Sequence, residues 1–115
     1  MISSEHRFHG RASLRFVFKQ GQVVRAQDVS LRYAKNNRIE NYRMAVVVSR
    51  KVSKSAVVRN RIRRRVYEIV RLQVTHITEP YDLVFSIFSD GPSKISAKQL
   101  EQTIHYCLRR AGVTK

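Results

Sequence analysis

The stretch from residue 57 to residue 71 constrains this chain more than any other, because an apolar stripe and a dense run of arginine share it. Its apolar residues recur at spacings of three and four, which predicts an amphipathic helix; they are Val58, Ile62, Val66, Ile69 and Val70. Arg61, Arg64 and Arg71 fall on the opposite face, where Glu68 alone offsets them. A solvated helix face normally mixes both signs. This helix therefore predicts a surface for a polyanion, whose phosphates guanidinium groups bind through paired hydrogen bonds.

The charge balance of the whole chain supports the same interpretation. Its 115 residues include 23 Lys and Arg against 8 Asp and Glu, a formal net charge of +15, which is typical of a nucleic-acid-binding protein. A hydrophobic fraction of 43% is ordinary for a globular chain, so we expect one domain over residues 1–115. We expect neither a membrane-spanning segment nor a signal peptide. Cys107 is the only cysteine, which suits a reducing, cytoplasmic location.

The segments around the arginine-rich helix predict a small sheet with helices packed on it. We expect helices at residues 10–20, 57 to about 74, and 96–110, and strands at 23–33, 43–49 and 81–88. An asparagine-rich turn separates the first two strands, which should form an antiparallel hairpin. Ser53 or Ser55 can cap the second helix and Ser96 the last. The predicted fold class is α+β, a single-domain α–β–β–α–β–α sandwich with a small mixed sheet.

Patterns that would indicate a catalytic site are missing from the sequence. His105 and Cys107 are two residues apart, which directs them away from each other on a helix. The spacings of structural zinc sites, paired carboxylates and a glycine-rich phosphate loop are not found. The sequence therefore predicts a binding protein without catalytic residues, and without a cofactor or metal ion of its own.

The residues Ser49-Arg50-Lys51, followed by Ala-Val-Val-Arg-Asn-Arg-Ile-Arg-Arg at 56–64, closely resemble the signature of the bacterial ribonuclease P protein component. That family's hallmark is Arg-Asn-Arg, an aliphatic residue and two basic residues, on a helix that follows an apolar strand. Nearly the whole chain follows the family layout, including the early helix with Phe18 before Gly21 and the strand at 81–88.

The resemblance implies the protein subunit of ribonuclease P, an endonuclease that removes the 5′ leader from precursor tRNA. Its implied partners are the catalytic RNA and precursor tRNA, with no membrane. The RNA, with magnesium, would carry out the catalysis, and the protein alone would be inactive. The resemblance also implies a ribosomal-protein-like fold with a left-handed strand–helix–strand crossover, although right-handed crossovers are the general rule.

Two sets of site residues follow from the resemblance. The residues that match the catalytic-RNA-binding motif are Arg59, Asn60, Arg61, Arg63 and Arg64. The residues at positions associated with binding of the precursor-tRNA leader are Leu14, Phe18, Arg32, Ser49 and Lys51. This chain departs from the family at Leu14 and Arg32, where aromatic residues are common, and at Tyr67, where a further basic residue is frequent.

Other interpretations stay open at this point. A ribosomal or general structured-RNA-binding protein would use the same arginine-rich helix without a leader site. A self-sufficient nuclease is disfavoured by the lack of clustered carboxylates, and a DNA-reading helix by the lack of a second helix for a helix–turn–helix pair. Phe16 and Phe18 can both be core residues rather than parts of a binding surface. As core, Phe18 would contribute to stability, and its loss would weaken binding of precursor and mature tRNA alike. As a binding residue, it would hardly affect the melting point and would matter only for precursors with a leader.

Overall fold

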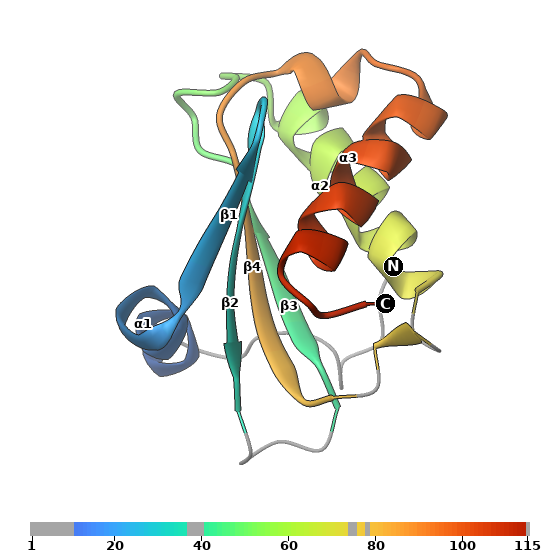
Figure 1. The fold of residues 1–115 in the computed structure, drawn as a ribbon. Helices are drawn as coiled ribbons and strands as arrows, with labels where there is room; N and C mark the ends of the chain where they lie inside the picture. The colour runs from blue at the N-terminus through green and yellow to red at the C-terminus, as the bar shows by residue number, and fades with distance from the viewer. Residues whose placement is uncertain (1–10, 37–40, 74–75, 78, 115) are drawn as a thin grey trace.

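The computed structural model contains a mixed sheet whose strand order differs from the order of the strands in the chain. It describes residues 11–36, 41–73, 76–77 and 79–114. The elements are α1 (Arg11–Gln20), β1 (Gln22–Ala26), β2 (Val29–Lys35), β3 (Arg43–Val47), α2 (Ala56–Arg71), β4 (Tyr81–Ile87), the short 3-10 helix η3 (Gly91–Ser93) and α3 (Ala97–Arg110). The strands lie in the order β1-β2-β4-β3 (Figure 1). The α+β class with a mixed sheet is therefore confirmed.

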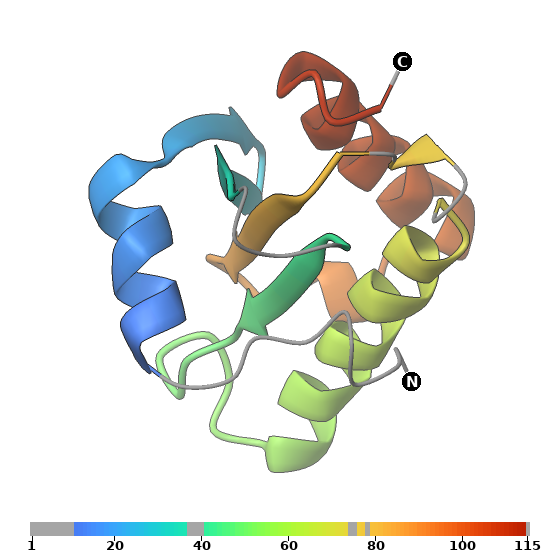
Figure 2. The same ribbon diagram turned by 90° about the horizontal axis from the view of Figure 1, so that it is seen from below.

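The strand β4, last in the chain, lies inside the sheet. It pairs antiparallel with β2 and parallel with β3, so the expected antiparallel hairpin between β2 and β3 is wrong. Parallel neighbours need a crossover connection, and α2 provides it. In Figure 1, β3 and β4 run upward with α2 to their right, and Figure 2 places β3 below β4. Taken together, the two views show a left-handed crossover, as the resemblance implied.

Residues 23–33 contribute to two strands rather than one. β1 and β2 form a hairpin in which Ala26 pairs with Val29, so Gln27 and Asp28 make the turn. Gln27 has a φ of 38°. Two-residue hairpin turns need positive φ and select Asn, Asp or Gly, so Gln at this position gave no turn signal. The chain consequently has one strand more than the α–β–β–α–β–α order predicted.

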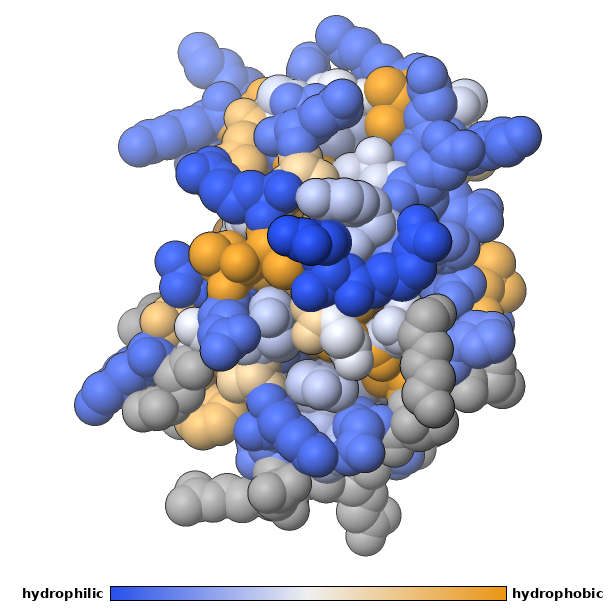
Figure 3. Space-filling model, viewed as in Figure 1, coloured by the Kyte–Doolittle hydropathy of each residue, from blue (hydrophilic) through white to orange (hydrophobic). Residues whose placement is uncertain are grey.

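The main core lies between the sheet and the pair α2 and α3, which cover one of its faces (Figures 1 and 2). On the outside, hydrophilic residues cover most of the face seen in Figure 3, with hydrophobic residues in smaller groups between them. α2 buries Ile62, Val66 and Val70 completely, at about 1.5–3 kcal/mol for each side chain removed from water. α3 is capped by Ser96, as predicted, in a capping box with Gln99. Burial raises the pKa of the Cys107 thiol to about 11, so this cysteine is protonated and unreactive at neutral pH.

α1 lies on the opposite face of the sheet, against β2 and β4. It ends at Gly21, whose backbone N–H donates to the carbonyl of Val17 at 2.8 Å. A Cβ on Gly21 would lie 2.4 Å from the Val17 oxygen and 3.0 Å from that of Tyr33. Glycine is required there because the backbones of α1 and β2 approach each other so closely.

The carboxylate of Asp82 on β4 is fully buried and connects three strands. It accepts hydrogen bonds from Arg43 of β3, at 3.0 Å from Nε and 3.2 Å from Nη2, and from Asn36 at the end of β2, at 2.9 Å from Nδ2. A buried carboxylate is stable only when it is paired in this way. The cluster therefore fixes the three strands relative to one another.

Replacing Asp82 by Ala should lower the free energy of unfolding by about 3–5 kcal/mol, because the Arg43 guanidinium would lose its buried partner. Urea unfolding followed by circular dichroism measures this change. The matched control is Glu79→Ala, which breaks the exposed ion pair with Lys35 and should cost far less because solvent screens it. Equal losses in the two variants would contradict a structural role for the Asp82 cluster.

Candidate RNA interface

The arginines at the predicted RNA-binding positions of α2 differ in what they contact. Arg59 and Arg63 are half-buried and donate hydrogen bonds to nearby backbone carbonyls. Arg61 and Arg64 are exposed, and no acceptor or carboxylate among the described residues pairs with either. A free guanidinium group can bind an external phosphate without first breaking an internal bond. Arg61 and Arg64 are therefore the best placed for a polyanion.

Arg59 and Arg63 stabilise the connection between β3 and α2 through hydrogen bonds. Arg59 Nη1 donates to the carbonyl of Ser53 at 2.9 Å, and Arg63 Nη2 to that of Val48 at 3.3 Å. Arg63 Nη1 also donates to Asn60 Oδ1 at 2.7 Å, so the Asn60 oxygen is already engaged. Ser55 is the cap of α2, because its Oγ accepts from the N–H of Val58. These bonds hold the first turns of α2 against the end of β3.

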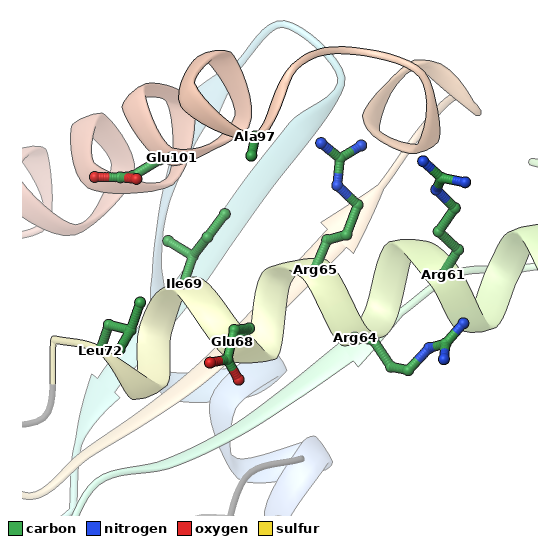
Figure 4. Close-up of a pocket in the computed structure, with 8 residues that line it drawn as sticks. All are labelled: Arg61, Arg64, Arg65, Glu68, Ile69, Leu72, Ala97 and Glu101. Carbon is green, nitrogen blue, oxygen red and sulfur yellow. The ribbon is translucent and has the colours of Figure 1, made fainter.

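Arg65 has a structural role of the same kind. Its Nη1 and Nη2 donate to the carbonyls of Pro92 and Ile95, both at 2.7 Å, and Figure 4 shows the side chain directed toward the segment before α3. Burial, and then the nearby charge of Arg61, lower the pKa of the Arg65 guanidinium. Arginine nevertheless stays charged in proteins. Arg65 thus links η3 and the residues after it to α2 through hydrogen bonds.

The surface around Arg61 and Arg64 is cationic and hollowed. The first turn of α2 contains no acidic residue, and the helix dipole adds positive potential there. Arg50, Lys51 and Lys54, in the connection before α2, are exposed. One hollow of about 430 Å³ is lined by Val57, Asn60, Arg63 and Arg64. A second, of about 520 Å³ between α2 and α3, is lined by Arg61, Arg64, Arg65, Glu68, Ile69, Leu72, Ala97 and Glu101 (Figure 4).

The other predicted site residues lie on the α1 side of the sheet or at its end. The Arg32 guanidinium carbon is 5.1 Å from the centroid of the Phe18 ring, a cation–π contact. Phe18 is 46% exposed, whereas its neighbour Val17 is fully buried, so the interpretation of Phe18 as a core residue is wrong. The Leu14 side chain lies outside the described residues.

Ser49 and Lys51 follow β3, and both are exposed. The Ser49 carbonyl accepts the N–H of Val52 at 3.0 Å in a turn, which fixes the path of the chain as it leaves the sheet. The structure therefore brings Phe18 and Arg32 into direct contact, whereas Ser49 and Lys51 stand at the end of β3.

A second arginine–aromatic pair was missed by the sequence reasoning. The Arg25 guanidinium carbon lies 4.9 Å from the centroid of the Phe88 ring. Phe88 was assigned to a buried strand at 81–88, but β4 ends at Ile87 and Phe88 is 51% exposed. Alternation along the strand was the available signal, since it places Phe88 on the face opposite Phe85 and Ile87.

Other kinds of site are not found in the described part of the chain. No three His, Cys, Asp or Glu side chains there come together in a way that could hold a metal ion. None of its helices has the length and apolar character needed to cross a membrane.

Comparison with known proteins agrees with this geometry. A model of the ribonuclease P family matches residues 2–112. The ribonuclease P protein component of Clostridium novyi is 32% identical over 113 residues, 97% of this chain and 98% of that protein. The solved RNase P protein of Staphylococcus aureus superimposes with a TM-score of 0.85 at 23% identity, over 96% of this chain and 98% of that one. The RNase P protein of Thermotoga maritima superimposes with a TM-score of 0.80 at 23% identity, over 90% of this chain and 96% of that one.

Fold and site together define a small, strongly basic α+β protein built around an arginine-rich crossover helix. The two structural likenesses establish this fold. The family match and the relative from Clostridium novyi go further, because each spans almost the whole chain. The chain belongs to the ribonuclease P protein component family.

The contacts of Arg65 predict that replacing this residue destabilises the fold, whereas replacing Arg61 does not. Arg65→Ala should lower the free energy of unfolding by about 1–3 kcal/mol, because the carbonyls of Pro92 and Ile95 lose their donors. Arg61→Ala should stay within about 0.5 kcal/mol of the parent chain. Thermal and urea unfolding of both variants check this, and an Arg61→Ala variant as unstable as Arg65→Ala would disprove the division.

Proposed function

We propose that this chain is the protein subunit of ribonuclease P, and that it binds the catalytic RNA through α2 and the 5′ leader of precursor tRNA across the α1 side of the sheet. The observation that carries the proposal is the cationic face of α2 in a chain of this family, where Arg61 and Arg64 are exposed without a partner among the described residues. Binding at both surfaces would assist removal of the leader.

The proposed contact with the catalytic RNA is mainly electrostatic. Each arginine that neutralises a phosphate releases condensed counterions, which makes the affinity fall with salt. Arg61 and Arg64 would make the direct phosphate contacts. Arg59 and Arg63 would position the helix, and the exposed Asn60 amide, whose oxygen already accepts from Arg63, would donate to a base edge or ribose. Because Arg59 ties the first turn of α2 to the preceding loop and Arg65 ties its middle to η3, the cationic face is preorganised.

The proposed contact with the leader uses stacking and cations. The open ring of Phe18 offers a surface to any base, worth about 1–3 kcal/mol per base, and Arg32 adds charge beside it. Ser49 and Lys51 would contact the backbone of the strand where β3 ends, and Leu14 would add an apolar contact without a ring. Recognition of the leader should therefore be nearly independent of its sequence.

Catalysis is assigned by this proposal to the RNA and its magnesium ions, in the cytoplasm. The side chains of the protein would hold the substrate and the RNA in place. A structured-RNA-binding protein without a leader site is the alternative outcome of the experiments below.

Replacing Arg61 or Arg64 by Ala should weaken binding to the catalytic RNA at every salt concentration. Each substitution should also reduce the slope of log affinity against log salt by about one unit. Asn60→Ala should weaken binding with little change in slope, because the side chain is neutral. Arg110→Ala, at the exposed end of α3, is the matched control. Filter binding across a salt series measures all four variants, and unchanged slopes for both Arg61→Ala and Arg64→Ala would place the RNA elsewhere.

Reconstitution with catalytic RNA and precursor tRNA at low magnesium tests the whole proposal. Leader removal should require the RNA, and purified protein alone should leave the precursor intact. Phe18→Ala should hardly change the melting temperature, because the ring is half exposed. It should weaken holoenzyme binding to precursor tRNA while leaving binding to mature tRNA unchanged. Equal affinity of the parent holoenzyme for precursor and mature tRNA would favour the general RNA-binding alternative.

A further inference from the structure

The Arg25–Phe88 pair lies on the same face of the sheet as Phe18 and Arg32. Along β1, Val24 and Ala26 pack against the main core, so Arg25 between them points to the α1 side. Phe88 follows Ile87, which is also part of the main core, and alternation again directs it to the α1 side. Both arginine–aromatic pairs therefore border the same surface.

The backbone at Phe88 is fixed, although its ring is exposed. Its N–H donates to the carbonyl of Asp28 at 2.8 Å, which joins the end of β4 to the turn between β1 and β2. The Arg25 guanidinium lies over one face of the ring. Phe88 as a whole is 51% exposed to solvent. This is the arrangement of a stacking surface with a cation behind it.

The strand positions between the two pairs carry small or apolar side chains. The sheet register aligns Arg25 with Ser30, Ser30 with Ser86, and Ser86 with Val47. Val47 is 41% exposed. Exposed large apolar residues gather on this side of the sheet; they are Phe18, Val23, Val47 and Phe88. A concentration of exposed apolar side chains among cations indicates a binding surface.

We propose that Phe88, backed by Arg25, is a second stacking surface for the single strand that Phe18 and Arg32 hold, so that the leader crosses the sheet between two aromatic rings. This inference rests on the leader binding proposed above. Phe88 lies four residues along β4 from Val84, the partner of Arg32, which is about 13 Å along the strand. At roughly 3.4 Å per stacked nucleotide, this distance spans no more than about four nucleotides.

Precursor tRNAs with 2-aminopurine at successive leader positions test the inference, because stacking quenches the fluorescence of this base. Bound to the reconstituted holoenzyme, the series should show two quenched positions a few nucleotides apart. Phe88→Ala, or Phe88→Leu, which keeps the apolar volume without a ring, should restore fluorescence at one of them. Phe18→Ala should restore it at the other. Phe88→Tyr should keep both quenched, and Tyr106→Ala, an exposed aromatic on α3, is the matched control.

Affinity gives an independent readout. Phe88→Ala should weaken binding of precursors with long leaders roughly five- to a hundred-fold, the range expected for one lost stacked base, and leave mature tRNA unaffected. If Phe88→Ala keeps both quenched positions while Phe18→Ala loses one, the second stacking surface is disproved and the proposed leader site stands. If the parent holoenzyme quenches no position, leader binding itself fails. An equal loss of affinity for precursor and mature tRNA would assign Phe88 to the catalytic-RNA interface and overturn the inference.

Discussion

The pairing of β4 on both of its edges is the constraint on which the rest of this structure depends. β4 bonds antiparallel to β2 and parallel to β3, and its buried Asp82 connects both neighbours through Arg43 and Asn36. The parallel pair requires a crossover, so α2 must lie across the sheet. The helix that carries the cationic face is thereby fixed relative to the sheet, which suits the proposed interface with a large RNA.

A helix so rich in arginine repels itself, and the structure shows how this repulsion is offset. Arg59, Arg63 and Arg65 direct their charges to backbone carbonyls at 2.7–3.3 Å, where the carbonyl dipoles stabilise them. The fully buried stripe on the other side holds the helix against the core. Only part of the positive charge is therefore left for an external partner. The same residue type serves both the fold and the proposed interface.

The sequence predicted the helices and strands, and which of their faces are buried, better than it predicted which strands are neighbours in the sheet. Apolar spacing identified the arginine-rich helix to within one residue of its start at Ala56, because periodicity reports which side is buried. It carries no information on which strands pair, so the position of β4 between β2 and β3 was missed. The turn at Gln27 was missed because its conformation is imposed by the hairpin and not favoured by its side chain.

For the site, sequence spacing placed Arg61 and Arg64 on the outer face of α2, where the structure has them. The carbonyl bonds of Arg59, Arg63 and Arg65 depend on loops that meet only in the folded chain. Adjacent apolar residues such as Val17 and Phe18 cannot be ranked by pattern alone, so the exposure of Phe18 needed the structure. The Arg25–Phe88 contact joins residues far apart in sequence, and no local pattern predicts such a contact.

The position of β4 also determines the order in which the chain can fold. Only Gln27 and Asp28 separate β1 from β2, so that hairpin can close as soon as it leaves the ribosome. β3 gains its partner strand only when β4 has been synthesised, since the register joins Arg43 to Asp82 and Val47 to Ser86 and chains emerge from the N-terminus. Until then β2 and β3 present open edges on which non-native strands can pair. A chain truncated after α2 would therefore hold a hairpin and an orphan strand, rather than a smaller version of this domain.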